Sequence, residues 1–152
     1  MKKFFAICAM LCLPFSAMAA ENYSVVFKTE GDFGFVNDLV KASIEGKGLK
    51  INHKNFIAEM LDRTGKDLGF TKQVYTNGEQ YEFCSATISR KMMEADPHAM
   101  VMCPYIISVY TIPNDKNVYI AYRKPATTKN PALKKALADV EKLLTEIIKE
   151  AL

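Results

Sequence analysis

The C-terminal segment, residues 130–152, carries the pattern that most restricts how this chain can fold. Asn130 and Pro131 are typical of a helix start, because the Asn side chain can cap free backbone N–H groups and proline needs no hydrogen-bond donor in the first turn. Apolar residues then recur every three or four positions, at Leu133, Leu137, Val140, Leu144 and Ile147. A helix that is apolar along one stripe must cover another apolar surface. We therefore expect a long terminal helix packed on one face of a sheet.

Strand patterns and helix patterns alternate upstream of that helix. Extended segments are expected at residues 23–29, 49–53, 80–84, 100–112 and 117–123. Helical spacing of apolar residues occurs at residues 36–44, 56–61 and 88–95, with Asn55 as the expected cap of the second helix. Pro104 lies inside the most apolar strand, where it cannot donate to a ladder, so we expect either a bulge or a position whose N–H direction is unpaired. This mixed order with a hairpin predicts an α+β fold in a single domain.

The first residues predict a secretory signal peptide. Two lysines form a positive start, residues 4–15 are apolar and uncharged, and AMA at residues 17–19 is a small-x-small cleavage site. The apolar run is too short to cross a bilayer, which needs about 20 residues. We therefore expect cleavage after Ala19, which removes residues 1–19. Residues 20–152 would then form the mature domain, periplasmic or secreted and without a membrane anchor.

The charge balance of the mature chain argues against nucleic acid as a partner. The whole chain has 20 Lys and Arg against 17 Asp and Glu, and loss of the two leader lysines leaves 18 against 17, a net charge of +1. Nucleic-acid binding needs a strongly basic patch or stripe. A nearly neutral exported chain does not fit that class.

Two cysteines remain after the leader is removed, Cys84 and Cys103. An even pair in an oxidising compartment is a disulfide candidate, whereas the eighteen residues between them exclude a CxxC motif and a closed zinc pattern. Strand alternation puts the two side chains on opposite faces, unless Pro104 or a strand end redirects one of them. The alternatives are two separate or reduced cysteines, and a metal, haem or redox role.

His98, Met100 and Met102 form a second candidate site. Thioether sulfur together with imidazole suits copper(I), which a periplasmic protein can encounter. The same residues also fit a core strand that follows an exposed turn, because methionine fills irregular gaps in cores. No cofactor is predicted from this pattern, and copper or haem is kept as the alternative.

Four tyrosines crowd the two strands of the predicted hairpin. They are Tyr105, Tyr110, Tyr119 and Tyr122. Amphipathic rings on a sheet face can hold an apolar ligand or a second copy of the chain, and they can equally be core residues. The sequence contains no G-x-S-x-G motif and no glycine-rich phosphate loop, so an enzyme is not the expected class.

The whole pattern resembles the DUF302 family of small bacterial domains. The segments that carry the resemblance are EGKGLKI, YEFCSATISRKMMEADPHAMVMCPYIISVYT and VYIAYRKP, and it extends over residues 23–152. It implies an antiparallel sheet packed by helices, akin to the TATA-binding-protein-like arrangement, and it allows a homodimer. It implies no activity and assigns no catalytic residue.

Together these observations favour an exported, non-enzymatic binding or accessory protein. Its partner would be a small ligand or another periplasmic protein, held on the tyrosine-rich sheet. The alternative is a thiol-redox or metal- or haem-handling protein that uses Cys84 and Cys103.

Overall fold

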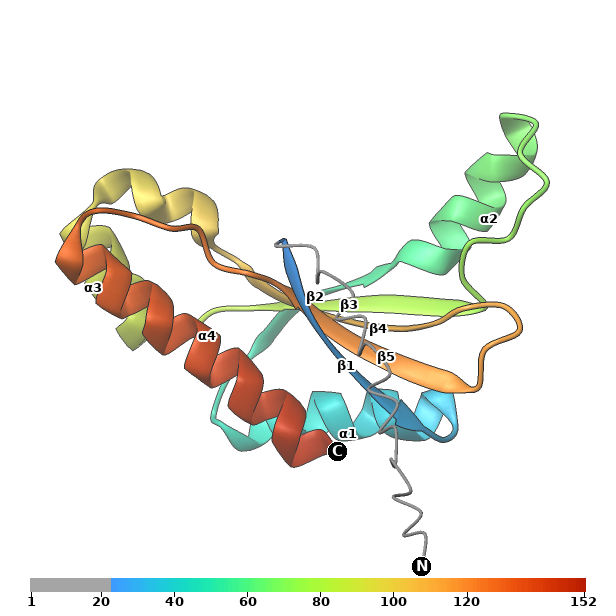
Figure 1. Ribbon diagram of the computed structural model, residues 1–152, viewed down its shortest axis with the longest axis horizontal. Coiled ribbons are helices and arrows are strands. Elements are labelled where there is room, and N and C mark those ends of the chain that lie inside the picture. The colour runs from blue at the N-terminus through green and yellow to red at the C-terminus, as the bar shows by residue number, and fades with distance from the viewer. Residues whose placement is uncertain (1–22) are drawn as a thin grey trace, which may run out of the picture.

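A five-stranded antiparallel sheet with strand order β1-β5-β4-β3-β2 forms the centre of the computed structural model, which describes residues 23–152 (Figure 1). Its strands are β1 (Ser24–Glu30), β2 (Ile51–Phe56), β3 (Asn77–Phe83), β4 (Tyr105–Thr111) and β5 (Asn117–Arg123). The helices are α1 (Phe33–Gly46), α2 (Ile57–Asp67), α3 (Ala86–Ala95) and α4 (Pro131–Ala151), with a 3-10 helix, η1 (Pro97–Met102). The α+β prediction is confirmed. The expected signal peptide and its cleavage after Ala19 lie outside the described residues and stay predictions.

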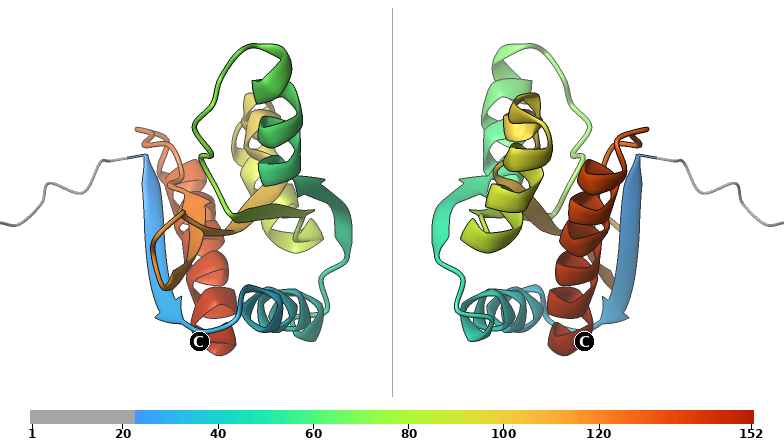
Figure 2. Two further views of the ribbon diagram at one scale, coloured as in Figure 1. Left: turned by 90° about the vertical axis from the view of Figure 1, so that its right-hand side faces the viewer. Right: turned by 90° about the vertical axis from the view of Figure 1, so that its left-hand side faces the viewer.

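Side chains alternate between the two faces of this sheet, and one face carries the core. Ile107, Val109 and Ile120 are 0% exposed on that face, where the register sets Val109 opposite Ile120. Residues from α1, α3 and α4 belong to the same hydrophobic cluster. These three helices lie on one side of the sheet, and α2 projects from the other (Figures 1 and 2). We call the two sides the covered face and the open face.

Helix α4 begins and packs as its sequence predicts. The Asn130 side chain accepts hydrogen bonds from the backbone N–H groups of Ala132 and Leu133, at 3.0 and 3.2 Å. The buried residues of the helix include the whole predicted stripe, Leu133, Leu137, Val140, Leu144 and Ile147. Within residues 23–152, none of the helices combines the length and apolar character needed to span a membrane.

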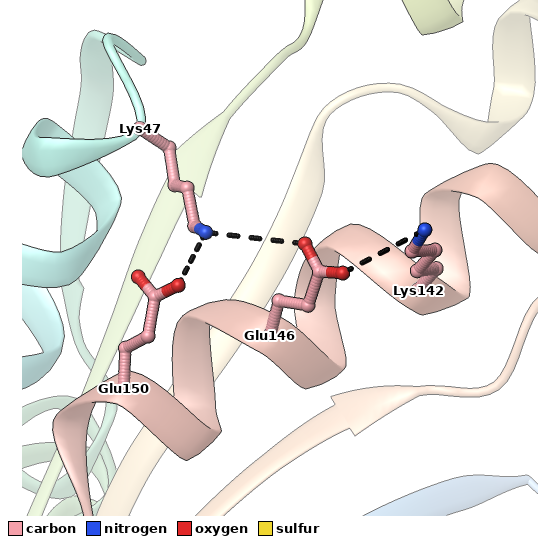
Figure 3. Close-up of polar contacts among 4 residues, drawn as sticks. All are labelled: Lys47, Lys142, Glu146 and Glu150. Atoms are coloured by element: carbon pink, nitrogen blue, oxygen red, sulfur yellow. Dashed lines mark hydrogen bonds and ion pairs between the residues drawn. The ribbon is translucent and has the colours of Figure 1, made fainter.

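A short network of ion pairs between side chains links the C-terminal end of α1 to the C-terminal part of α4 (Figure 3). The ammonium group of Lys47, which follows α1, binds the Glu150 carboxylate and lies 3.9 Å from that of Glu146. Lys142 lies 3.9 Å from the same Glu146 carboxylate. The hydrogen bond to Glu150 raises the pKa of Lys47 above its usual value. Because these groups are partly or fully exposed to solvent, the contacts orient the helix ends more than they stabilise them.

The predicted strand at residues 100–112 is wrong at its start. Asp96 and the proline after it begin η1, because the Asp96 carboxylate accepts a hydrogen bond from the backbone N–H of His98 at 2.9 Å. The strand begins only at Tyr105. The peptide bond before Pro104 is cis. This proline precedes the ladder, so neither of the two arrangements expected within the strand is formed.

Helix α2 departs from the predicted capping and leaves most of its surface unpacked. Asn55 lies in β2, where its amide donates to the Glu82 carboxylate at 2.6 Å, and α2 begins after Phe56 without a side-chain cap. Ala58 is the one buried residue of this helix. It approaches to 3.4 Å of where a Cβ would stand on Gly78 of β3, so the missing side chain allows the close contact. This contact sets the base of α2 against the open face.

Candidate functional site

A groove of about 390 Å³ opens on the open face of the sheet. Its floor is continuous across four strands, because the register sets Val26 opposite Ala121, Ala121 opposite Ser108, and Ser108 opposite Gln80. Gly78 continues the floor along β3. The Gln80 amide donates to the Ser108 hydroxyl at 3.1 Å. The small side chains at the centre leave the hollow that larger residues would fill.

Aromatic rings wall one side of the groove. The rings of Tyr75 and Tyr110 meet edge to face at 5.4 Å, with 68° between their planes. Tyr110 in turn stacks on Tyr119 at 5.3 Å and 14°. Burial is the main cause of the raised pKa of Tyr110, and Tyr75 and Tyr119 add to it. Ile57 from α2 and Tyr23, just before β1, also line the groove, so its lining is largely apolar and rich in aromatic rings.

Among the described residues that line the groove, one charged side chain, that of Arg123, has no partner in an ion pair or hydrogen bond. Among the residues that line the groove, Glu79 and Arg123 are charged. Glu79 pairs with Val109, whose side chain lies on the covered face, and the Glu79 carboxylate lies there too, binding the Lys54 ammonium group at 2.7 Å and accepting a hydrogen bond from the Asn37 amide of α1 at 2.5 Å. This carboxylate therefore faces away from the groove. Arg123 makes no side-chain hydrogen bond and no ion pair within residues 23–152. Within this part of the chain, its guanidinium therefore has all its donors available for water or a ligand.

A second cavity of about 210 Å³ adjoins the groove and leads toward α4. It shares Gln80, Ser108 and Arg123 with the groove and also touches Val140 and Leu144 of α4. It lies where β4 and β5 diverge, since their pairing ends at Ile107 and Tyr122. The residues shared by both hollows place Arg123 at their junction.

The structure separates the four tyrosines that the sequence grouped. Tyr105 and Tyr122 are 3% exposed on the covered face, where their hydroxyls bond to Ser89 at 2.9 Å and Thr145 at 2.8 Å. Burial raises the pKa of Tyr105 to about 12, and burial likewise raises that of Tyr122. Tyr110 and Tyr119 stack on the open face. Two of the four phenol rings are therefore in the core, and two are beside the groove.

The structure brings the side chains of Cys84 and Cys103 together as free thiols. The last pair of the β3–β4 ladder is Phe83 with Tyr105, so both cysteines lie just beyond the ladder. Strand alternation therefore does not force them onto opposite faces. The Cys103 sulfur also lies 3.3 Å from the Ser89 hydroxyl.

The surroundings of this thiol pair limit its chemistry. Burial raises the pKa of the Cys84 thiol, and the neighbouring Cys103 raises it further. Reactive cysteines have lowered pKa values, because the thiolate is the nucleophile. Cys84 thus fits a bridge-forming partner better than a rapid nucleophile. The disulfide stays a prediction.

His98, Met100 and Met102 are not gathered on one side of η1. His98 and Met100 are exposed, whereas Met102 packs partly buried against the core. Residues two apart are 240° apart around a 3-10 helix, which has three residues per turn. Within residues 23–152, no group of three or more His, Cys, Asp or Glu side chains could hold a metal ion. Copper binding here stays untested.

Sequence reasoning missed the groove floor and Arg123. The available signal was the alternation within the predicted hairpin, where Ser108 and Ala121 are small residues between large apolar ones. These two residues form one floor only because the strand register sets them opposite each other, and the sequence pattern did not predict that register.

Comparisons with known proteins agree with this architecture. The family model described as "Domain of unknown function DUF302" matches residues 25–151. A solved structure, "Crystal structure of uncharacterized conserved protein DUF302 from Bacillus stearothermophilus", is similar with a TM-score of 0.70 and 16% sequence identity, over 85% of this chain and 98% of that chain. At this identity the likeness concerns the fold alone. No curated protein matches the chain.

Proposed function

This chain belongs to the DUF302 family, and we propose that it is a non-enzymatic binding protein that holds a small, largely apolar ligand in the groove of its open sheet face. The observation that carries the proposal is the hollow of about 390 Å³ with an aromatic wall. Small-molecule sites are usually clefts of about 300–1,000 Å³ with mostly apolar linings and a few polar groups. The groove matches that description in size and in lining.

The polar groups of the groove support recognition rather than acid–base chemistry. Among the described residues of the lining, Glu79 is the one acidic residue, and its carboxylate lies on the covered face, where Lys54 and Asn37 bind it. Gln80 and Ser108 bond to each other in the floor and offer their remaining donors and acceptors to a ligand. We place this role in the periplasm, after cleavage behind Ala19, on the strength of the sequence.

The proposal is tested with N-phenyl-1-naphthylamine, a neutral probe whose fluorescence increases in apolar surroundings. We expect saturable binding to the purified protein. Ala121→Phe fills the centre of the floor and should weaken binding at least about tenfold, because a filled hollow cannot also hold the probe. Ala132→Phe, at an exposed position on α4, should bind as the unmodified protein does.

Circular dichroism and urea midpoints check that both variants are folded, and Ser108→Phe offers a second way to fill the floor if Ala121→Phe is not. The binding proposal is overturned if the probe does not bind, or if floor variants that fold bind it unchanged.

A second candidate function, thiol–disulfide chemistry, is favoured by the adjacent Cys84 and Cys103 thiols. Forming their bridge releases two protons and two electrons, which a partner oxidoreductase would accept by reduction of its own disulfide to two thiols. The raised pKa of Cys84 favours a bridge that stabilises the fold over one that turns over rapidly. Intact mass after exposure to oxidised glutathione would show the loss of two hydrogen atoms. Rapid exchange with a dithiol at neutral pH would favour the redox function instead.

A further inference from the structure

We propose that the ligand of the groove is a flat, amphipathic monoanion, an apolar ring system that carries a carboxylate, and that Arg123 binds the acid group. This inference rests on the proposed function, because it names the ligand class of the same groove. It follows from the one free charge of the groove, the position of that charge, and the shape of the apolar wall.

The charges of the groove select an anion. The Glu79 carboxylate lies on the covered face, where the Asn37 amide and the Lys54 ammonium group bind it, so the lining presents the single positive charge of Arg123. A guanidinium presents planar donors that match both oxygens of a carboxylate. An apolar cation would find no free carboxylate in this lining, and a neutral ligand would leave the guanidinium unused.

The position of Arg123 makes it an anchor for one end of the ligand. It lies at the end of β5, opposite Ser24 of β1, and at the junction of the groove with the smaller cavity. The aromatic wall continues from there toward Tyr110 and Tyr75. A molecule with its acid group at Arg123 would therefore lay its body across the small floor residues, against the rings.

The wall favours a flat body. Edge-to-face contact between Tyr75 and Tyr110 holds their rings at 68° to each other, and Tyr119 stacks behind Tyr110. Such supported rings offer a rigid apolar surface at little cost in side-chain entropy. The centre of the floor beside them consists of the small residues Gly78, Ser108 and Ala121, which suits a planar ligand better than a branched one.

The test compares two isosteric competitors, 2-naphthoate and 2-naphthamide, which differ in charge but hardly in shape. Each displaces N-phenyl-1-naphthylamine from the purified protein, and the affinity of this reporter is measured separately for every variant. We expect naphthoate to bind about fivefold tighter than naphthamide, the upper range for an ion pair near the surface. The ratio should fall toward one in Arg123→Gln and at 1 M salt, which screens exposed charges. It should persist in Lys135→Gln, an exposed control on α4.

Each other outcome is decisive. Equal binding of the two competitors overturns the charge inference and leaves the groove function standing, because the reporter still binds. A ratio that persists in Arg123→Gln assigns the anion to another residue and overturns the anchor. Failure of the reporter to bind overturns both proposals. If sedimentation experiments show that the protein dimerises and that reporter binding weakens as it does so, a second copy of the chain occupies the groove, and the inference is also overturned.

Discussion

The covered face and the open face of the sheet consist of alternate residues of the same strands. Along β4, Ile107 and Val109 are 0% exposed beneath the helices, whereas Ser108 and Tyr110 line hollows on the other side. Across from them in β5, Ile120 is 0% exposed, and its neighbour Ala121 belongs to the groove floor. One step along the chain thus separates a position that stabilises the fold from a position that can contact a ligand.

This difference indicates that the covered face contributes most of the free energy of unfolding. Three helices bury the large side chains of the covered face, and burial of such a side chain contributes about 1.5–3 kcal/mol. The open face has small residues at its centre and rings at its margin, so it contributes less to stability. Substitutions on the covered face should therefore change the free energy of unfolding, and substitutions on the open face should change ligand binding.

The largest expected change in the free energy of unfolding is seen when substitutions are compared at two neighbouring residues, one on each face of the sheet. Ile107→Ala should lower the free energy of unfolding by about 2–5 kcal/mol, because it leaves a cavity in the core. Ser108→Ala should cost about 1 kcal/mol or less, since it removes one partly buried hydrogen bond to Gln80. Urea unfolding of both variants checks this contrast. Equal losses would show that the open face carries as much of the stability as the covered face.

The next effect concerns the end of the sheet, where Cys84 and Cys103 lie beyond the β3–β4 ladder. A bridge between them would close a loop of eighteen intervening residues and stabilise the fold by about 3 kcal/mol. We expect that difference between oxidised and reduced protein in urea unfolding. Under oxidising conditions Cys84→Ser and Cys103→Ser should lose similar amounts, and the double variant no more than either. Additive losses, or an unchanged midpoint on oxidation, would contradict a structural bridge.

A smaller effect is expected at alkaline pH from phenols on the covered face. Burial is the main cause that raises the pKa values of Tyr81 and Tyr105 from 10.0 to about 12. Because the folded state retains protons that the unfolded state loses, their contribution is complete below pH 10 and is lost as pH rises toward 12. At one unit above the unfolded pKa, the loss should be on the order of 1 kcal/mol for each phenol. Unfolding midpoints that stay constant from neutral pH to pH 11 would contradict this burial effect.

The smallest effect is expected at the exposed margin of the open face. The Tyr119 hydroxyl donates to the Asp115 carboxylate at 2.6 Å, and this bond is the main cause that lowers the pKa of Asp115 from 3.8 to about 2. Any stability that this lowered pKa supplies is present above pH 3.8 and is lost as pH falls through about 2. Tyr119→Phe should bring the Asp115 pKa back toward its ordinary value while the urea midpoint hardly moves. A carboxylate titration by NMR checks the shift, and an unchanged pKa would contradict the cause.

Local patterns predicted the last two elements of the domain well. Strand β5 has the predicted bounds, 117–123, and α4 begins directly after its predicted cap, Asn130. Prediction failed where two local signals competed. The apolar run from Met100 favoured a strand, but Asp96 with its proline started η1 instead. Asn55 fits a cap by composition, yet Glu82 on the neighbouring strand binds its amide.

The sequence by itself determined the α+β class, the stripe of α4 and the membership in the DUF302 family, because these depend on spacing within short segments. Only the tertiary structure decided which tyrosines are core and which are beside the groove, since that depends on the face that the helices cover. The adjacency of Cys84 and Cys103 was decided there as well. The groove has the same origin: Val26 meets Ala121 only because β1 joins the sheet beside β5. Side-chain alternation is a local property of a strand, whereas strand order is set by burial between residues far apart in the chain.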